Sequence, residues 1–298
     1  MNILFLSPAM RMDYQCDCLF HGLRTLYGPS IIDSPRLDHM YQDYSGDSSQ
    51  LYGQGFTLSR LLPEIPVDRS NLKQRIMDHA FDLIIYGSIH RDQSYFDLVC
   101  RTYAPHEILL IDGEDQSHLM YNLTRHGIYF KRELAEPMAK IHPIHFAIPA
   151  SKISTQRQVA KDRVRAHCDP RDRSTYTFTT EADYYHDYAR SLFAFTMRKG
   201  GWDCLRHYEI MANGCIPLFL DLEQCPATTC MQLPKGELLE AMQYADRDGL
   251  FWDTPEGHSI WLSLHRRLHI KFVCHSTTER LAQYVIETQQ RAASEVAA

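Results

Sequence analysis

The stretch SLFAFTMRKGGWDCLRHYEIMANGCIPLFLD, residues 191–221, has the pattern of a strand, a loop, a helix and a second strand. An apolar run from Ser191 to Met197 leads into a basic turn with two adjacent glycines. A helix-length segment follows, in which apolar residues recur at the spacing of one buried face. Gly214 suits the left-handed position that ends a helix, and the apolar run from Cys215 to Leu220 comes next. We therefore expect a β/α/β unit here.

The loop and the helix start have the features of a phosphate site. Unpaired backbone amides and the helix dipole favour an anion at a helix N-terminus, and Gly200 and Gly201 would let a phosphate come close to the backbone. We expect Asp203 to accept hydrogen bonds from the first-turn amides of a helix that begins near Cys204.

Charged residues complete the predicted pocket. Arg206 can form a forked contact with a diphosphate, and Glu209, three residues later on the same face, can accept both hydroxyls of a ribose. Arg198 and Lys199 add positive charge to the loop. The plainer interpretation is a solvated turn with a surface ion pair. The position of Arg206 and Glu209 between two apolar strands argues against it, because stray charge is costly there.

The segment RKGGWDCLRHYEIMANGCIPLF, residues 198–219, resembles the donor-binding motif of GT-B glycosyltransferases, especially the exostosin-like and the capsule or lipopolysaccharide-type enzymes. This resemblance implies that Glu209 binds the nucleotide ribose and that Arg206, Gly200 and Gly201 bind the diphosphate. Retaining members of related families carry a second glutamate eight positions before the ribose-binding one, where this chain has Gly201. The resemblance is thus compatible with either retention or inversion.

The whole composition is that of a globular protein. The chain has 298 residues, 44% hydrophobic and 23% charged, which suits two medium domains or one large one with a sizeable core. A net charge of −6 argues against a surface that coats DNA. The nine cysteines are scattered and odd in number, which favours a reducing cytoplasm. The pairs Cys16/Cys18 and Cys225/Cys230 lack the spacing of a zinc knuckle.

The amino-terminal half alternates strands and helices. Its opening, MNILFLS, reads as a buried strand and not as a signal sequence, and no run in the chain is long enough to cross a bilayer. Ser7-Pro8-Ala9 follows this strand in place of a G-x-G-x-x-G turn, which argues against a nucleotide-dependent oxidoreductase. Further strands are expected at 81–87, 107–111 and 128–134, helices at 14–27, 72–79 and 93–103, and a long loop at 31–55.

Polar residues follow two of these strands, where ligands of parallel sheets gather. His90, Asp112 and Asp115 are candidates for the general base that an inverting transferase needs, although an Asp-Gly turn or a capping histidine is the plainer explanation for each alone. Asp112-Gly113-Glu114 also suggests the manganese site of GT-A glycosyltransferases. The stronger motif lies late in the chain and favours GT-B. Lys131 and Arg132, at the end of the next strand, either face the cleft or are solvated, and the second is commoner for a charged strand end.

The prolines between residues 141 and 149 predict an extended crossover between two domains. We therefore expect an acceptor-binding domain at 1–148 and a nucleotide-sugar-binding domain at 149–298, with a terminal helix crossing back. The charged segment 156–173, with its five arginines, is predicted to be a surface helix and turn, and it raises the possibility of nucleic-acid binding. Other helices are expected at 184–191, 233–245, 259–268 and 277–291.

The predicted protein is an α/β glycosyltransferase with two Rossmann-like domains that face each other across a cleft, as in GT-B enzymes. We expect it to be cytoplasmic and metal-independent, and to move a sugar from a nucleoside-diphosphate sugar to an acceptor hydroxyl on a glycan, without a further cofactor. Two alternatives are a DNA-modifying glycosyltransferase that acts on a hydroxylated base and a non-catalytic relative that binds a nucleotide sugar.

Overall fold

The computed structural model describes residues 1–8, 12–153 and 160–297, which form a mixed α/β structure with two parallel sheets. Two parts of the sequence predictions lie outside the described residues. They are Ala9 in the turn after the first strand and the start of the charged segment, which includes Arg157.

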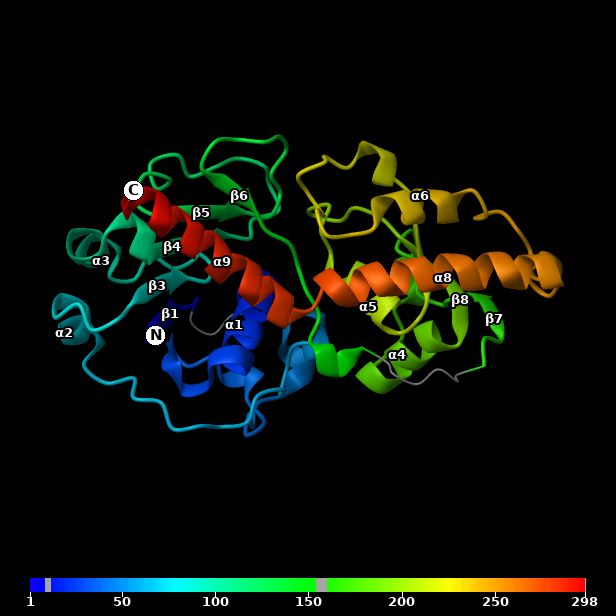
Figure 1. Ribbon diagram of the computed structural model, residues 1–298. Helices are drawn as coiled ribbons and strands as arrows, with labels where there is room; N and C mark the ends of the chain where they lie inside the picture. Colours follow the sequence, from blue (N-terminus) through cyan, green and yellow to red (C-terminus); the bar gives the residue numbers. More distant parts are fainter. Residues whose placement is uncertain (9–11, 154–159, 298) are drawn as a thin grey trace.

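Six strands of the amino-terminal half form one sheet, and every neighbouring pair in it is parallel (Figure 1). The strand order is β2-β1-β3-β4-β5-β6, so the direction of winding reverses between β1 and β3. The bounds are Ile3–Leu6 (β1), Ile31–Ser34 (β2), Leu83–Tyr86 (β3), Ile108–Asp112 (β4), Ile128–Lys131 (β5) and Ile141–Pro143 (β6). Such a reversal leaves a crevice at the carboxyl ends of the strands, where ligands of parallel sheets bind.

Both faces of this sheet are covered by helices. Ile3 and Phe5 of β1 belong to the core that contains residues of α1 (Tyr14–Tyr27) and α9 (Thr278–Ala297). Leu4 and Leu6 belong to a second core with α2 (Leu72–Met77) and α3 (Phe96–Thr102). Successive residues of a strand face opposite sides, so a strand that is apolar at every position fits a sheet buried on both faces.

The segment predicted as a loop at 31–55 begins with a strand, which corrects that prediction. Ile31 of β2 lies opposite Ile3 of β1, and both side chains are buried. The strand is short, and polar residues follow it directly, so its apolar pattern is weak in the sequence. Pairing with β1 stabilises it, and that contact joins residues far apart in the chain.

Three further strands form the second parallel sheet, in the order β7-β8-β9. They are Arg163–Arg165 (β7), Ser191–Thr196 (β8) and Ile216–Phe219 (β9), with the helices α4 (Glu181–Ala189), α5 (Leu205–Ala212), α6 (Lys235–Met242), α7 (Gly249–Trp252) and α8 (Pro255–His275). The strand, loop, helix and strand predicted for residues 191–221 are confirmed by β8, α5 and β9.

Two predictions in this half differ from the structure. The described part of the charged segment contains β7 where a helix was expected, because Arg163 and Arg165 alternate with the half-buried Val164 at the period of a strand and pair with β8. The helix predicted at 259–268 is longer: α8 begins after Thr254, whose hydroxyl accepts a hydrogen bond from the Gly257 amide, and runs to residue 275.

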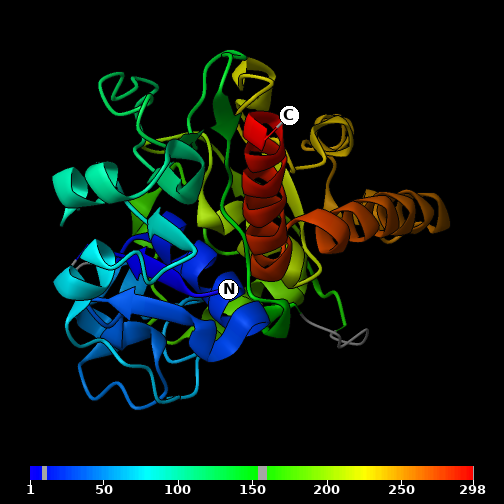
Figure 2. The same ribbon diagram turned by 60° about the vertical axis from the view of Figure 1, so that its left-hand side comes forward.

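The last helix returns to the six-stranded sheet. In Figures 1 and 2, α9 leaves the end of α8 and lies along the part of the molecule that contains β1 to β6. It packs against α1 where Gly22 has no side chain, since a Cβ there would collide with the Thr278 carbonyl. Nδ1 of His21 also lies 2.8 Å from Oγ1 of Thr278. Both chain ends therefore belong to the same core.

Candidate functional site

A cavity of about 830 Å³ lies where the carboxyl ends of the two sheets face each other. Its lining comes from both halves of the chain. From the amino-terminal half come residues near the start of α1, in the loop 50–56 and after β3, β4 and β5. From the carboxyl-terminal half come residues after β7, at the start of α4, and in the loop and helix that follow β8.

Arg206 and Lys199 form a cationic wall of the cavity. The Arg206 guanidinium carbon lies 4.9 Å from the centre of the Tyr176 ring, and the buried Nε of Arg206 has no hydrogen-bond partner among the described residues. Lys199 donates to the Pro170 carbonyl at 2.9 Å and lies 5.8 Å from the same ring. Burial is the main reason why the pKa of Lys199 is lowered, and the charge of Arg206 adds to it. A bound anion would satisfy both groups.

Glu209 lies deeper in the cavity and already accepts two hydroxyl groups. It is buried, and its carboxylate accepts hydrogen bonds from Oγ1 of Thr57 and from the Tyr184 hydroxyl at 2.8 Å. Burial raises the pKa of Glu209. Both oxygens of the carboxylate therefore accept a hydroxyl of the protein itself in this structure, one from Thr57 and one from Tyr184.

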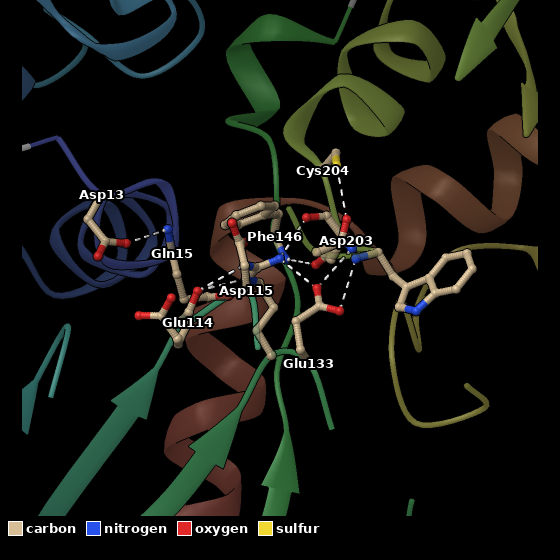
Figure 3. A network of polar contacts seen from close by, with 12 residues as sticks. Asp13, Gln15, Glu114, Asp115, Glu133, Phe146, Asp203 and Cys204 are labelled. Carbon is tan, nitrogen blue, oxygen red and sulfur yellow. Dashed lines mark hydrogen bonds and ion pairs between the residues drawn. The ribbon is translucent and has the colours of Figure 1, made fainter. Parts of the chain in front are cut away.

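Gly200 and Gly201 line the cavity, and two carboxylates of the other sheet lie against them. A Cβ on Gly200 would collide with Asp115, and one on Gly201 would collide with Glu133. The Glu133 carboxylate accepts hydrogen bonds from the amides of Trp202 at 2.9 Å and the following residue at 3.0 Å. The glycines therefore allow anionic groups to approach the backbone, and in this structure those groups belong to the protein (Figure 3).

Asp203 does not cap α5, which corrects the sequence prediction. The N-cap residue is Cys204, and the buried carboxylate of Asp203 accepts hydrogen bonds from the Phe146 amide at 2.6 Å and from the Tyr208 hydroxyl at 3.0 Å. A distant segment thus supplies the donor that we expected from the first turn. This contact connects the crossover between the sheets to the loop before α5.

Arg132 is buried beside the cavity with only 1% of its surface exposed, so of the two alternatives for this strand end the solvated one is wrong. Its guanidinium pairs with Glu133 at 2.7 Å and with Asp115, and it donates to the carbonyls of Gly113 at 2.9 Å and Asp203 at 2.7 Å. It also lies 4.5 Å from the centre of the Phe146 ring. One arginine therefore joins both halves of the chain at the floor of the site.

The three candidate bases lie at the ends of β3 and β4, and Asp115 is the one of them that lines the cavity. Half of its side chain is exposed, and the pair with Arg132 orients it. Asp112 lies behind it, where it accepts from Tyr129 at 2.5 Å and pairs with Lys131 at 3.0 Å. His90 is nearly buried, with Nδ1 3.8 Å from Asp112.

Asp13 is a further cavity residue that the sequence prediction missed. It caps α1 by accepting from the amides of Gln15 at 3.1 Å and Cys16 at 3.2 Å. It also accepts from Ser88 at 2.7 Å and pairs with Arg91 at 3.0 Å. An aspartate directly before a helical pattern was the available signal in the sequence, since this is a common N-cap residue. Its contacts with the segment after β3 required the fold.

Arg198 is a predicted donor-site residue that does not line the cavity. Its guanidinium carbon lies 5.1 Å from the centre of the Trp202 ring, and its amide donates to Asp221 at 3.1 Å. Arg198 thus supports the loop from outside. The structure brings Lys199, Arg206 and Glu209 together with Asp115, and leaves His90 and Asp112 behind the lining.

Within residues 1–8, 12–153 and 160–297, no group of three or more histidine, cysteine, aspartate or glutamate side chains is arranged to hold a metal ion. In the Asp112-Gly113-Glu114 segment, the oxygens of Asp112 are engaged by Tyr129 and Lys131. Across the same described ranges, no helix combines the length and the apolar character that crossing a membrane requires.

The folded state should lose stability as the pH falls below about 6.5, because His145 and His207 are buried and neutral. Burial lowers the pKa of His145 to about 4 and that of His207 to about 3. In the unfolded chain both imidazoles take up a proton near pH 6.5, so acid first stabilises the unfolded state. We expect each to cost about 2 kcal/mol of unfolding free energy between pH 7 and pH 5, measured by urea denaturation.

The variant His207→Gln isolates one of these contributions. Burial raises the pKa of Asp203 and of Glu209, so their contribution to the free energy of unfolding increases in acid. This change is opposite in sign to that of the histidines. They are present in both proteins and cancel in the comparison. The stability difference, wild type minus variant, should therefore fall by about 2 kcal/mol from pH 7 to pH 5. A difference that stays constant with pH would contradict a buried neutral His207.

No family model, no curated protein and no solved structure matches the chain.

Proposed function

We propose that the protein is a GT-B type glycosyltransferase that moves a sugar from a nucleoside-diphosphate sugar to an acceptor hydroxyl. In this proposal each sheet belongs to a Rossmann-like domain, with the boundary near residue 148, and the two domains face each other across the cavity. The cavity in turn lies at the carboxyl ends of parallel strands, where such folds bind ligands. The resemblance of residues 198–219 to GT-B donor motifs supports the same interpretation.

The observation that carries the proposal is that Arg206 and Glu209 both lie in one cavity wall. The buried Nε of Arg206 has no hydrogen-bond partner among the described residues, and Glu209 offers a buried carboxylate that accepts hydroxyls. A diphosphate next to a ribose matches this order of groups. Tyr176, under the Arg206 guanidinium, provides an aromatic surface beside the same wall.

The proposed reaction uses groups on both walls of the cavity. The acceptor hydroxyl attacks the anomeric carbon, and Asp115 takes the proton from that hydroxyl. The bond between the anomeric carbon and the diphosphate oxygen breaks, and the diphosphate leaves with the electron pair. Arg206 and Lys199 stabilise the negative charge that develops on it. This scheme describes inversion at the anomeric carbon by direct displacement, and product analysis by NMR would show the stereochemistry.

Calorimetric titration with UDP, GDP, CDP and ADP tests the donor site. We expect one of them to bind in the micromolar range, and Arg206→Ala to weaken its binding about 100-fold. Two charge-assisted hydrogen bonds of about 1.5 kcal/mol each account for that factor. Arg267→Ala is the matched control, because Arg267 pairs with Glu240 on the exposed side of α8. Equal loss of binding and of thermal stability in Arg206→Ala would argue against its role in the donor site.

The acceptor in this proposal is a glycan and not DNA. Arg163 pairs with Asp187 at 2.9 Å and Arg171 pairs with Asp169 at 2.5 Å, so two arginines of the charged segment are already neutralised.

Measuring donor hydrolysis separates an active enzyme from a non-catalytic relative. Titration with and without manganese separates the proposed metal-independent site from a GT-A type site.

A further inference from the structure

A row of aromatic rings leads from the mouth of the cavity to Arg132 and Asp115. Tyr52 is 71% exposed and lines the cavity, and its ring centre lies 5.1 Å from that of Tyr14. The centres of the Tyr14 and Phe146 rings lie 6.1 Å apart in an edge-to-face arrangement. The Arg132 guanidinium carbon lies 4.5 Å from the centre of the Phe146 ring. The row thus ends at the arginine that holds the proposed base.

The exposed ring is held in place by its neighbours. The hydroxyl of Tyr14 donates to the carbonyl of Tyr52 at 3.3 Å, and two residues later Gln54 donates to the Phe178 carbonyl at 3.0 Å. Gly53, between them, has a positive φ of 59° and leaves no room for a side chain, because a Cβ would collide with the Tyr14 hydroxyl. The loop is therefore fixed at both sides of Tyr52, which remains open to solvent.

The polar groups on this side differ from those of the donor wall, the part of the lining that contains Lys199, Arg206 and Glu209. Gln50, Asp13 and Asp115 line the cavity here together with Arg91, whose charge is balanced by Asp13. Asp13 and Asp115 are each paired with an arginine, so the two arginines on this side are already engaged by carboxylates and favour a phosphate less than Arg206 does. Neutral polyols suit it, because their hydroxyls can donate to carboxylates and amide oxygens while their C–H faces cover an aromatic ring.

We propose that Tyr52 and Tyr14 form an acceptor subsite for a neutral saccharide, in which a pyranose ring stacks on Tyr52 and directs the next hydroxyl toward Asp115. This inference rests on the proposed glycosyl transfer and names the residues that bind its acceptor. Tyr52 is then a residue for acceptor recognition with no part in donor binding. A base that stacked on the same ring would instead make Tyr52 part of the nucleotide site.

Saturation-transfer NMR and titration with maltotriose, cellotriose and chitotriose, in the presence of the nucleotide that binds, test this subsite. We expect at least one trisaccharide to bind in the millimolar range, and Tyr52→Ala to weaken that binding at least tenfold. Tyr52→Trp should retain it, since the larger ring still stacks. Tyr121→Ala is the matched control, because Tyr121 is 67% exposed and does not line the cavity.

Nucleotide binding is measured separately and should change less than twofold in Tyr52→Ala. A parallel loss of nucleotide affinity would place Tyr52 in the donor site and overturn the inference. So would a wild-type protein that binds nucleotide but none of the three trisaccharides, or one that binds a DNA duplex through Tyr52. Absence of nucleotide binding in the wild type would instead refute the proposed function, and trisaccharide binding lost in Tyr52→Ala would then still identify a saccharide site.

Discussion

Replacing Asp115 with asparagine should lower kcat by a factor of about 10² to 10⁴ while the affinity for the nucleotide stays within twofold. The amide has the shape of the carboxylate and can still accept a hydrogen bond from Arg132, but it cannot take the proton of the acceptor hydroxyl. Rates from initial-velocity assays, together with calorimetric nucleotide titrations, separate the two effects.

The neighbouring carboxylate offers a matched control for this experiment. Glu114 is 36% exposed and lies 3.5 Å from Nε2 of His90, outside the cavity lining. Glu114→Gln should retain kcat within about threefold, because it removes a similar charge without touching the proposed reaction path. If Asp115→Asn turns over as fast as the wild type, the base is another residue, and Asp13 becomes the next carboxylate to test.

Replacing Arg132 with methionine should lower the free energy of unfolding by about 3 to 5 kcal/mol. The substitution keeps an unbranched apolar side chain but removes the charge between Asp115 and Glu133. Burial already raises the pKa of Glu133, so the loss of its partner leaves a buried carboxylate uncompensated. The Asp203 carbonyl also loses its donor. Urea denaturation at pH 7 measures the change.

A double variant shows whether the unpaired charge is the cause. Adding Glu133→Gln to Arg132→Met removes the carboxylate that the first substitution leaves without a cation. The double variant should then be more stable than the sum of the single effects implies, by at least about 1 kcal/mol. Additive effects, or a loss of less than about 1 kcal/mol in Arg132→Met alone, would contradict a central role for this ion-pair network.

Much of the secondary structure was predictable because strands buried on both faces leave continuous apolar runs in the sequence. Leu83–Tyr86 and Ile108–Asp112 are such runs, and the structure confirms both as strands. Three strands, β2, β6 and β7, were not predicted. The segment of β6 was expected only as an extended crossover, but it pairs with β5. Both β2 and β7 are short, with polar residues within or beside them, and they form because a neighbouring strand satisfies their backbone groups.

The common position of Arg206 and Glu209 in one cavity wall was predictable because both lie within one β/α/β unit. Arg206 and Glu209 are three positions apart on a helix, and that spacing alone predicts a common face. The structure places both in the lining of the cavity. Arg198, eight residues before Arg206, lies in a loop, where spacing does not determine the direction of a side chain. Its guanidinium lies near the Trp202 ring, and Arg198 is not among the residues that line the cavity.

The sequence by itself therefore determined the α/β class, most strands and helices, and the local chemistry of residues 198–209. Only the tertiary structure decided which carboxylates meet that loop. The Glu133 carboxylate accepts hydrogen bonds from the amides of residues 202 and 203, which are about 70 positions away in the chain. Arg132 forms an ion pair with Asp115 beside the same loop. Periodicity reports which face of an element is buried, whereas such contacts depend on how the two sheets are placed against each other. That placement follows from the packing of many helices and strands together. No single stretch of sequence determines enough of this packing to predict the placement.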